Sequence, residues 1–221
     1  MPKTKNFWDS FYKDQNNKKI IDESSFAHFV QKFIEADSLV IDMGCGNGRD
    51  SRFLSLFYDV VGVDQSDEAI ALCRTQILPM TNTTKTLDFR VLSIEDENIC
   101  QIFNAKYIKD KKKSVFVYAR FFLHAIDKMQ CERFWDFVQC MNRDSSVSVG
   151  VEFRTNEDEN NFKQFPDHFR RYLDPTAVVT DAESRGFRVR EIHQGYGLAK
   201  YKSEDPHLAR IIFDSRRRHV W

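Results

Sequence analysis

The stretch Val40-Ile41-Asp42-Met43-Gly44-Cys45-Gly46-Asn47-Gly48-Arg49-Asp50 decides the fold. An apolar run ends in three alternate glycines, and a helical pattern follows over 52–58. Glycine permits positive φ angles and lets a ligand lie against the backbone. In an open α/β sheet, ligands bind at the carboxyl ends of the strands, beside the point where the strand order reverses. The stretch therefore predicts a strand, a ligand-binding turn and a helix.

The spacing of the glycines separates this turn from the dinucleotide-binding pattern Gly-x-Gly-x-x-Gly. Arg49 and Asp50 follow Gly48, so the pattern here is Asp-x-Gly-x-Gly-x-Gly. A second apolar run over 59–64 ends in Asp64, and a carboxylate about 20 residues after a glycine turn can accept hydrogen bonds from both ribose hydroxyls. A nucleotide-type ligand is therefore expected. A dinucleotide-dependent oxidoreductase remains the rival at the level of the fold, and a turn-capping role remains the alternative for Asp64.

The rest of the chain alternates between apolar runs and helical patterns. The runs are continuously apolar, which suits parallel strands that are covered on both faces. We therefore predict a doubly wound α/β fold with a mostly parallel seven-stranded sheet, helices on both faces and a C-terminal antiparallel hairpin. The predicted strands span 39–43, 59–64, 88–94, 114–119, 147–153, 187–193 and 207–215, and the predicted helices span 23–36, 52–58, 67–78, 131–141 and 176–185.

A single domain over 1–221 is the simplest organisation, because no repeat and no Gly-, Pro- or Ser-rich linker interrupts the chain. Within it we expect an N-terminal cap and first helix (1–36), a cofactor-binding core (37–153), and a substrate-facing arm with the final strands (154–221). The 33 Lys and Arg balance the 33 Asp and Glu, which argues against nucleic acid as a partner. No apolar run approaches the ~20 residues of a membrane span, and no signal peptide is evident.

The cysteines indicate a reducing compartment. They number five, an odd count, and no Cys-x-x-Cys pair occurs. We therefore expect reduced thiols, a cytoplasmic location in the cell or host cytosol, and no structural metal.

The glycine turn, Asp64 and the order of elements resemble the class I S-adenosylmethionine-dependent methyltransferases. The resemblance implies S-adenosyl-L-methionine as the cofactor, with the glycine turn under its methionine portion, the acid on its ribose and the end of the third strand beside its adenine. The aromatic residues ahead of the first helix are expected to close over the methionine portion. The expected cofactor contacts are Trp8, Tyr12, Asp42, Gly44, Gly46, Gly48, Arg49, Asp64, Gln65, Ser93, Ile94, Glu95 and Ala119.

In that family the end of the fourth strand faces the methyl group and the acceptor. We therefore predict two catalytic residues there, His124 as general base and Arg120 as a ligand for the acceptor or the cofactor carboxylate. A histidine suits the base because it titrates near neutral pH; a buried, inert ring is the alternative. Aromatic, cationic and acidic residues at later strand ends and in the arm are expected to bind the substrate, with solvated surface charge as the alternative: Glu152, Arg154, His168, Arg171 and Tyr196.

Two short strings resemble a narrower group. Arg120-Phe121-Phe122-Leu123-His124-Ala125-Ile126 and Gly197-Leu198-Ala199-Lys200-Tyr201 are similar to small bacterial and large-DNA-virus methyltransferases of capsular, lipopolysaccharide or capsid glycans. This implies O-methylation of a sugar hydroxyl, for example on rhamnose, by a monomer or homodimer. The alternatives are methylation of a small metabolite on nitrogen, oxygen or sulfur, methylation of nucleic acid or protein, and cofactor binding without catalysis.

Overall fold

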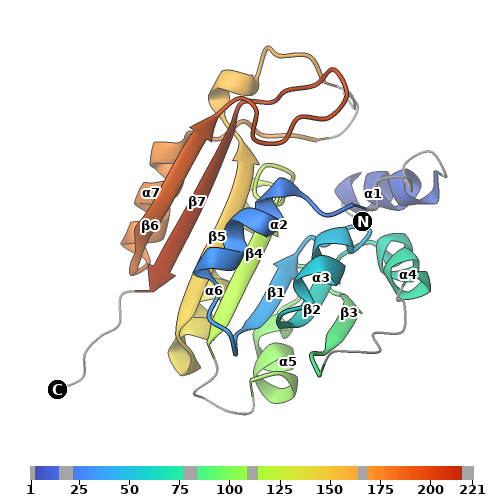
Figure 1. Ribbon diagram of the computed structural model, residues 1–221, viewed down its shortest axis with the longest axis vertical. Coiled ribbons are helices and arrows are strands. Elements are labelled where there is room, and N and C mark those ends of the chain that lie inside the picture. Colours follow the sequence, from blue (N-terminus) through green and yellow to red (C-terminus); the bar gives the residue numbers. More distant parts are fainter. Residues whose placement is uncertain (1–2, 15–21, 77–83, 109–113, 164–168, 216–221) are drawn as a thin grey trace.

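A seven-stranded sheet forms the centre of the computed structural model, which describes residues 3–14, 22–76, 84–108, 114–163 and 169–215 (Figure 1). The strand order is β3-β2-β1-β4-β5-β7-β6, and β1 to β5 run parallel, whereas β7 runs antiparallel to β5 and β6. This confirms the predicted doubly wound fold. The strands are β1 (Leu39–Met43), β2 (Asp59–Asp64), β3 (Leu87–Val91), β4 (Val115–Arg120), β5 (Val147–Arg154), β6 (Phe187–Gly195) and β7 (Leu208–Ser215).

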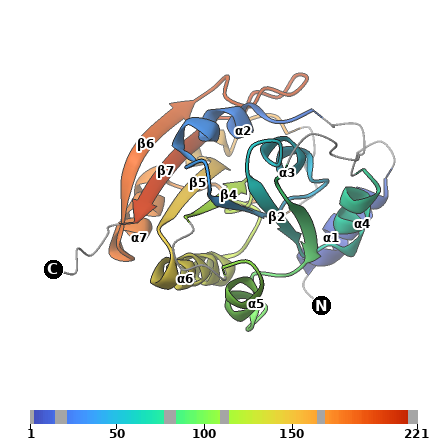
Figure 2. The ribbon, with the colours of Figure 1, turned by 60° about the horizontal axis from the view of Figure 1, so that its bottom comes forward.

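Helices cover both faces of the sheet (Figure 2). One face carries α5 (Ile99–Lys106), α6 (Lys128–Asp144) and α7 (Pro175–Ser184), and the other carries α2 (Ser25–Val30), α3 (Arg49–Leu54) and α4 (Asp67–Thr75). Successive residues of a strand face opposite layers, so neighbours such as Val40 and Ile41 enter different cores. The remaining elements are α1 (Lys3–Lys13) and the short 3-10 turns η2 (Gln31–Phe33) and η3 (Asn156–Asp158).

Most helices begin at a residue whose side chain satisfies a free backbone N–H. Ser24 and Ser66 do this for α2 and α4, and Asp174 precedes Pro175 at the start of α7. Asp127 and Gln130 form a capping box that starts α6. Ser66 thus marks the start of α4, as the predicted helix over 67–78 requires. Helix α3 begins at Arg49, ahead of the predicted 52–58, and α1 and α5 were not predicted from the sequence.

The cysteines differ from expectation. Cys100 on α5 and Cys140 on α6 form a disulfide, whereas Cys45, Cys73 and Cys131 are free thiols. The prediction of reduced thiols throughout is therefore wrong for this pair, because packing of α5 against α6 brings together two residues 40 positions apart. Within the described ranges, no helix combines the length and apolarity needed to cross a bilayer.

The glycine turn shows why glycine is required. Gly48, which precedes α3, has φ +73°, and an added Cβ would lie 2.8 Å from both Cys73 Sγ and the Phe89 ring. A substitution there must disturb the packing of α4 against β3 as well as strain the backbone. Gly186, after α7, has φ +89°, but an added Cβ would meet nothing within 4 Å.

We expect Gly48→Ala to lower the free energy of unfolding by about 2–4 kcal/mol, since overpacking and a strained φ each cost about 1–3 kcal/mol. Gly186→Ala serves as the matched control, because it adds only the strain. Urea unfolding followed by circular dichroism measures both. An equal loss in the two variants would contradict the packing argument.

Candidate active site

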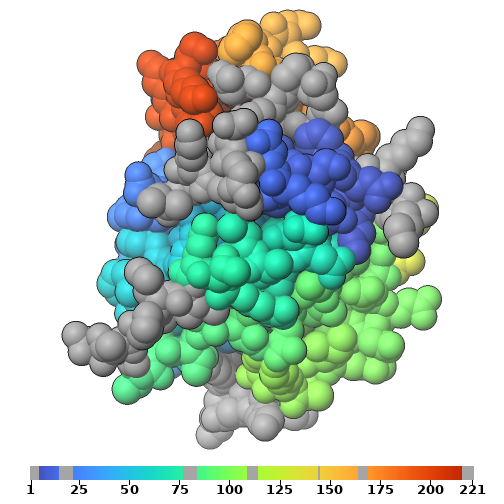
Figure 3. Space-filling view, turned by 90° about the vertical axis from the view of Figure 1, so that its right-hand side faces the viewer, coloured from blue at the N-terminus to red at the C-terminus, as the bar shows by residue number. Residues whose placement is uncertain are grey.

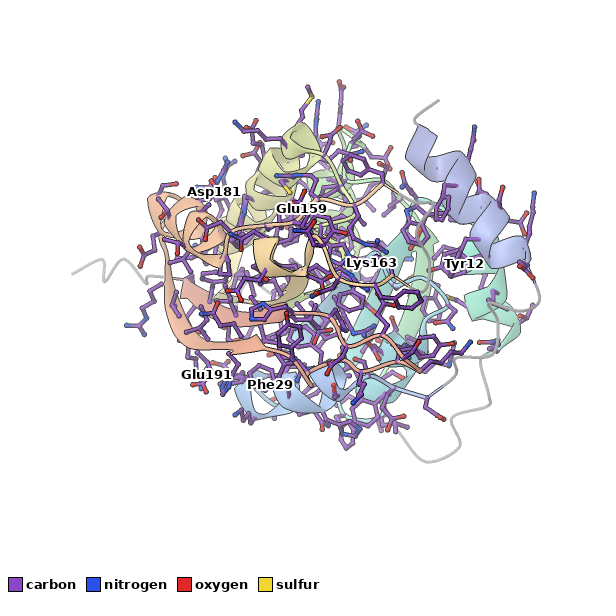
Figure 4. The ribbon with its side chains drawn as sticks, turned by 90° about the horizontal axis from the view of Figure 1, so that it is seen from above. Tyr12, Phe29, Glu159, Lys163, Asp181 and Glu191 are labelled. Carbon is purple, nitrogen blue, oxygen red and sulfur yellow. A yellow bond between two sulfur atoms is a disulfide. The ribbon has the colours of Figure 1, made fainter. Side chains whose placement is uncertain are left out.

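One cavity of about 640 Å³ opens at the carboxyl ends of the parallel strands. Its walls come from the ends of β1, β2, β4 and β5, from α1, and from the segment between β6 and β7. Figure 4 looks onto this end of the sheet and shows Tyr12 on the side of α1 that faces the strands. Elements distant in sequence therefore meet at the place where an open α/β sheet binds its ligand.

The glycine turn forms one wall of the cavity. The backbone amides of Gly44 and Cys45 both donate to the Val63 carbonyl, at 2.8 and 3.0 Å, which fixes the turn on the end of β2. Gly44 and Gly46 have φ of 72° and 56°. An added Cβ at Gly44 would lie 2.6 Å from the Phe122 ring, and one at Gly46 would overlap the Tyr12 hydroxyl. The glycines thus let the Phe122 ring and the Tyr12 hydroxyl approach the backbone of the turn closely.

Asp64 ends β2 at the rim of this turn. Its carboxylate accepts the Gly46 amide at 3.0 Å and the Ser66 amide at 2.9 Å, so its orientation is fixed from two sides. Burial raises the pKa of Asp64 to about 6, against the opposing effect of these amides. At pH 7 it is still mostly ionised, and a carboxylate held in this way suits a pair of ligand hydroxyls.

Asp42 lies deeper, at the end of β1. Its Oδ2 accepts a 2.5 Å hydrogen bond from the Ser51 hydroxyl. Burial raises the pKa of Asp42 from 3.8 to about 8; the Ser51 bond opposes this, and the charges of Asp50 and Asp64 add to it. Asp42 is therefore largely protonated at pH 7 when no cationic ligand is beside it.

Helix α1 closes one side of the cavity. Trp8, Phe11 and Tyr12 line it. Three polar contacts join α1 to the start of α4: Lys5 to Asp67 at 2.7 Å, Ser66 to Asp9 at 2.6 Å, and Lys13 to Glu68 at 3.3 Å. Figure 3 shows α1, in dark blue, lying against α4, in blue-green. The helix is thus positioned to shield a ligand at the glycine turn.

A second group of charges surrounds the ends of β4, β5 and β7. Glu152 is fully buried, and its two oxygens accept from Arg120 Nε at 2.9 Å and Arg210 Nε at 2.6 Å. Arg210 also donates to Ser25 Oγ and to the Leu198 carbonyl, each at 2.7 Å. Glu152 thereby ties the ends of three strands to α2 and to the segment after β6. Its charge, with that of Asp50, raises the pKa of Arg120 despite burial.

Arg154, at the end of β5, is paired differently. Its guanidinium bonds Asp158 at 2.6 Å and Glu204 at 2.5 Å, and all three side chains are buried. Lys163 adds a second cation to Asp158 at 3.3 Å. Two carboxylates therefore balance two cations, and Arg154 fixes the arm that carries Asp158 to the segment that carries Glu204.

Phe121 joins these two groups. It has φ +56°, which is rare for a bulky residue, and its amide donates to the Glu152 carbonyl at 2.8 Å. The ring lies 4.2 Å from the Arg120 guanidinium and 5.9 Å from that of Arg154, and 5.1 Å from the His124 ring. These contacts restrict both guanidinium groups to orientations over the ring.

His124 lines the cavity but is held by the backbone. Its Nδ1 accepts the Arg154 amide N–H at 3.2 Å. A neutral imidazole with an accepting Nδ1 carries its proton on Nε2. In this arrangement Nε2 carries the ring N–H, and Nδ1 can take up a proton only by releasing the Arg154 amide. The role of His124 as general base stays a prediction.

Most of the predicted site residues come together. Those that line the cavity are Trp8, Tyr12, Asp42, Gly44, Gly46, Arg49, Asp64, Gln65, Ser93, Ile94, Arg120, His124 and Arg154. His168 lies outside the described residues.

Six predicted contacts do not line the cavity. Gly48 packs on α4, and Ala119 faces the core on the α6 side. The exposed Glu95 accepts a hydrogen bond from Gln130, and it is Gln130 that lines the cavity. Glu152 lies behind Arg120 and accepts its hydrogen bond. Arg171 donates to the Ile126 carbonyl and to Cys131 Sγ. The side chain of Tyr196 is 56% exposed, and its ring contacts that of His207. The structure therefore places these six residues outside the cavity wall: Gly48, Glu95, Ala119, Glu152, Arg171 and Tyr196.

The sequence reasoning missed other lining residues. Asp50 accepts from the Ser24 amide and hydroxyl at 2.7 and 2.8 Å and from the Tyr118 hydroxyl at 2.6 Å. Burial alone would raise the pKa of Asp50, but Arg120, Arg49 and these donors hold it below its ordinary value. Its place directly after the glycine turn was the available signal. Arg170, Gln130 and Glu204 carry no comparable pattern.

Known proteins share these features. Residues 40–120 match the family described as a methyltransferase domain. The chain also superposes on an S-adenosylmethionine-dependent methyltransferase from Anabaena variabilis with a TM-score of 0.73, at 16% identity, covering 98% of this chain and 96% of that one. Residues 40–120 are therefore similar to a methyltransferase domain, and the chain shares the fold of S-adenosylmethionine-dependent methyltransferases.

Two further relatives were found. The N-methyltransferase NodS of Bradyrhizobium japonicum, in complex with S-adenosyl-L-homocysteine, superposes with a TM-score of 0.66 at 12% identity, over 98% of this chain and 100% of that one. Putative methyltransferase 235L of Invertebrate iridescent virus 6 is 28% identical over 91 residues, or 40% of this chain. The matched region spans 31% of the viral protein, about a third of its length.

The cofactor contacts expected at Gly44, Gly46, Asp64, Gln65 and Ile94 all line this cavity, and their roles toward a ligand stay predictions. Among the described residues, no cluster of His, Cys, Asp or Glu is arranged to hold a metal ion.

Asp42 predicts the pH dependence of stability without cofactor. Its pKa is raised in the folded protein, so between about pH 4 and pH 8 the native state binds more protons than the unfolded chain, and stability falls as pH rises. Asp64 acts in the same direction up to about pH 6. We expect Asp42→Asn to flatten this profile and to be relatively more stable at pH 8. Urea unfolding at pH 5 and pH 8 tests this; an unchanged slope would refute the assignment.

Helix α1 predicts a second effect. Deleting 1–14 removes Trp8 and Tyr12 from the cavity wall, and we expect the Kd for S-adenosylhomocysteine to rise about tenfold or more, a loss of about 1.4 kcal/mol. Lys13→Ala is the control, because its exposed pair with Glu68 contributes little. Isothermal titration calorimetry gives both values. If the deletion left the Kd unchanged, α1 would have no part in cofactor binding.

Proposed function

We propose that this protein transfers a methyl group from S-adenosylmethionine to a sugar hydroxyl of a glycan, for example on a rhamnose of a viral or bacterial surface glycan. The observation that carries the proposal is the far half of the cavity, beyond the glycine turn. There, arginines held by buried carboxylates surround an aromatic ring, next to a histidine whose Nδ1 accepts the Arg154 amide, which leaves the ring proton on Nε2 as a donor. Sugars present hydroxyl oxygens to such donors and C–H faces to aromatic rings.

The size of the cavity agrees with a two-part ligand. About 640 Å³ is within the range that small-molecule and cofactor sites occupy. The match to a viral putative methyltransferase supports an enzyme of this kind, although that protein's name gives no acceptor. Tyr201 and Pro206 extend the aromatic and apolar wall on the side away from the glycine turn.

The chain's own residues orient the reactants. The bound cofactor supplies a methyl group already activated on a sulfonium, so proximity and in-line alignment make the main contribution. Nε2–H of His124 donates to the acceptor oxygen and directs a lone pair toward the methyl position; as the new O–CH3 bond forms and the S–CH3 bond breaks, the hydroxyl proton leaves to solvent water. Arg120 donates from its remaining guanidinium nitrogens while Glu152 holds its Nε. Helix α1 and Phe122 exclude water above the glycine turn.

Methyl transfer from labelled S-adenosylmethionine to rhamnose-containing oligosaccharides tests the proposal. We expect His124→Ala to lower kcat by about 10- to 1000-fold, the loss of one preorganised donor, with little change in cofactor Kd. His124→Gln keeps a donor, so we expect it to recover most of that loss.

If His124 instead acts as the base, His124→Gln will be as inactive as His124→Ala. Cofactor binding abolished by Asp64→Ala is the control that locates the site. Methylation of small amines or thiols with no transfer to any sugar would replace the glycan proposal with the small-metabolite alternative. Transfer to nucleic acid or protein alone would likewise exclude it.

A further inference from the structure

Exposed aromatic side chains are concentrated beside the cavity. In the part of the chain that the structure describes, the exposed Phe, Tyr and Trp side chains are Phe57, Phe162, Phe169 and Tyr196, which are 45% to 63% exposed. Phe57 directly follows α3, whereas the other three lie on the arm between β5 and α7 or on the segment between β6 and β7. Aromatic rings in water do not stabilise a fold, and a group of them marks a binding surface.

Both of these segments contribute to the cavity wall. Arg170 of the arm and residues 197–201 of the segment between β6 and β7 line the cavity. Tyr196 directly precedes this run, and its ring contacts that of His207, which follows the lining residue Pro206. Tyr196 therefore lies beside the cavity, outside its wall.

One buried arginine holds the two segments together. Arg154, at the end of β5, pairs with Asp158 on the arm and with Glu204 on the segment between β6 and β7. Lys163 adds a second contact to Asp158, at 3.3 Å. The arm and the other segment are therefore fixed relative to each other at the edge of the cavity.

Tyr196 is exposed but held in place. Its hydroxyl accepts a hydrogen bond from Asn161 Nδ2 at 3.3 Å, and its ring makes an edge-to-face contact with His207, at 4.9 Å between the centroids. His207 is buried and shares a 2.6 Å hydrogen bond with Thr155 Oγ1. Phe162 directly follows Asn161, so its backbone lies beside Tyr196. The surface is ordered before a ligand binds, which lowers the entropy cost of binding.

The side chains around the two rings indicate the class of ligand. Neither segment has an exposed Leu, Ile, Val or Met among its described residues, although protein interfaces and membrane-binding surfaces commonly present such side chains. The exposed charges have both signs, with Glu157 and Glu159 on the arm and Lys200 and Lys202 on the other segment. This mixture does not favour nucleic acid or an anionic lipid surface. Aromatic rings among polar groups suit a sugar, whose C–H groups contact the negative face of a ring and whose hydroxyls bond the polar groups.

We propose that Phe162 and Tyr196 form an outer subsite, which binds a second sugar of the acceptor next to the sugar that enters the cavity. The inference rests on the proposed function and adds to it the length of the acceptor: an oligosaccharide or the end of a polysaccharide, and not a free monosaccharide. Stacking on one aromatic ring contributes about 2- to 10-fold in affinity. Two rings together therefore favour a chain over a single sugar by about tenfold or more.

Methyl transfer to rhamnose and to its di- and trisaccharide tests the outer subsite. We expect the KM to fall about tenfold or more from the monosaccharide to the trisaccharide, because only the longer acceptor reaches the rings. The preference should survive added salt, since stacking of a neutral sugar is not screened. Calorimetric titration of the trisaccharide into the protein loaded with S-adenosylhomocysteine gives the same comparison without turnover.

Phe162→Ala and Tyr196→Ala should each raise the KM of the trisaccharide about 2- to 10-fold and should change that of rhamnose by less than about twofold. Tyr196→Phe keeps the ring without the hydroxyl and should retain most of the preference for length. Phe57→Ala is the matched control, because it removes an exposed ring outside both segments and should leave the preference as it is. All four variants should keep the Kd for S-adenosylhomocysteine, and their melting temperatures check the fold.

The outcomes separate the two proposals. Equal KM values for the three acceptors, or a preference for length that survives both alanine variants, would overturn the outer subsite and leave sugar methylation standing. Neither transfer to any of the three acceptors nor binding of the trisaccharide would overturn both. Binding to phosphatidylcholine vesicles that Tyr196→Ala weakens, without any preference for length, would assign the rings to a lipid surface instead.

Discussion

The parallel register of β1, β4 and β5 is the constraint on which the site depends. It places Asp42 opposite Tyr118, and Arg120 opposite Glu152. All three strands end at one edge of the sheet, so side chains from distant parts of the sequence meet without any long-range loop having to position them. The antiparallel β7 adds Arg210, which lies opposite Glu152 from the other side. The ion pair Arg120–Glu152–Arg210 is thus a direct consequence of strand pairing.

Buried charges of this kind are a poor source of stability. Removing ions from water costs several kcal/mol for each ion, and the attraction between them often only offsets that cost. Glu152, Arg154, Asp158 and Glu204 are nevertheless buried together at the cavity wall. Their effect is to hold Arg120 and the arm in fixed positions. Apolar side chains in place of these buried charges would stabilise the fold equally well. The far half of the cavity, beyond the glycine turn, would then lack oriented hydrogen-bond donors.

The sheet could be predicted from the sequence because the apolar pattern of its strands is periodic and local. The apolar runs at β1, β2, β4 and β5 and the glycines between β1 and α3 need no knowledge of the rest of the chain. Helix α5 was missed because no side chain caps its start and it spans only eight residues. Helix α1 was not predicted from the sequence because its aromatic residues face a cavity wall that is formed by residues far along the chain.

The same limits apply to the site. Strand ends can be found from the sequence, and Asp64, Arg120 and His124 were found in this way. Alternation then decides which neighbour faces the cavity: Tyr118 and Arg120 line it, and Ala119 does not. The irregular arm has no regular alternation of side chains. Nothing in the sequence therefore indicates that Arg170 lines the cavity and Arg171 does not. The proton position on His124 depends on one backbone amide, from Arg154, that lies 30 residues away.

Phe121 shows how one backbone conformation positions several side chains of the cavity. A left-handed conformation for a bulky residue costs about 1–3 kcal/mol and persists only where the surroundings determine it. Here the amide of Phe121 is bonded to the Glu152 carbonyl, and its ring is packed between Arg120 and His124. A residue in the ordinary extended conformation would continue β4 and direct His124 elsewhere. The strained turn ends the strand at Arg120 and brings the following residues back over the glycine turn, so that Phe122 contacts Gly44 and His124 reaches Arg154. The left-handed conformation of Phe121 therefore places the donors Arg120 and His124 on the same short segment as Phe122, which covers the glycine turn.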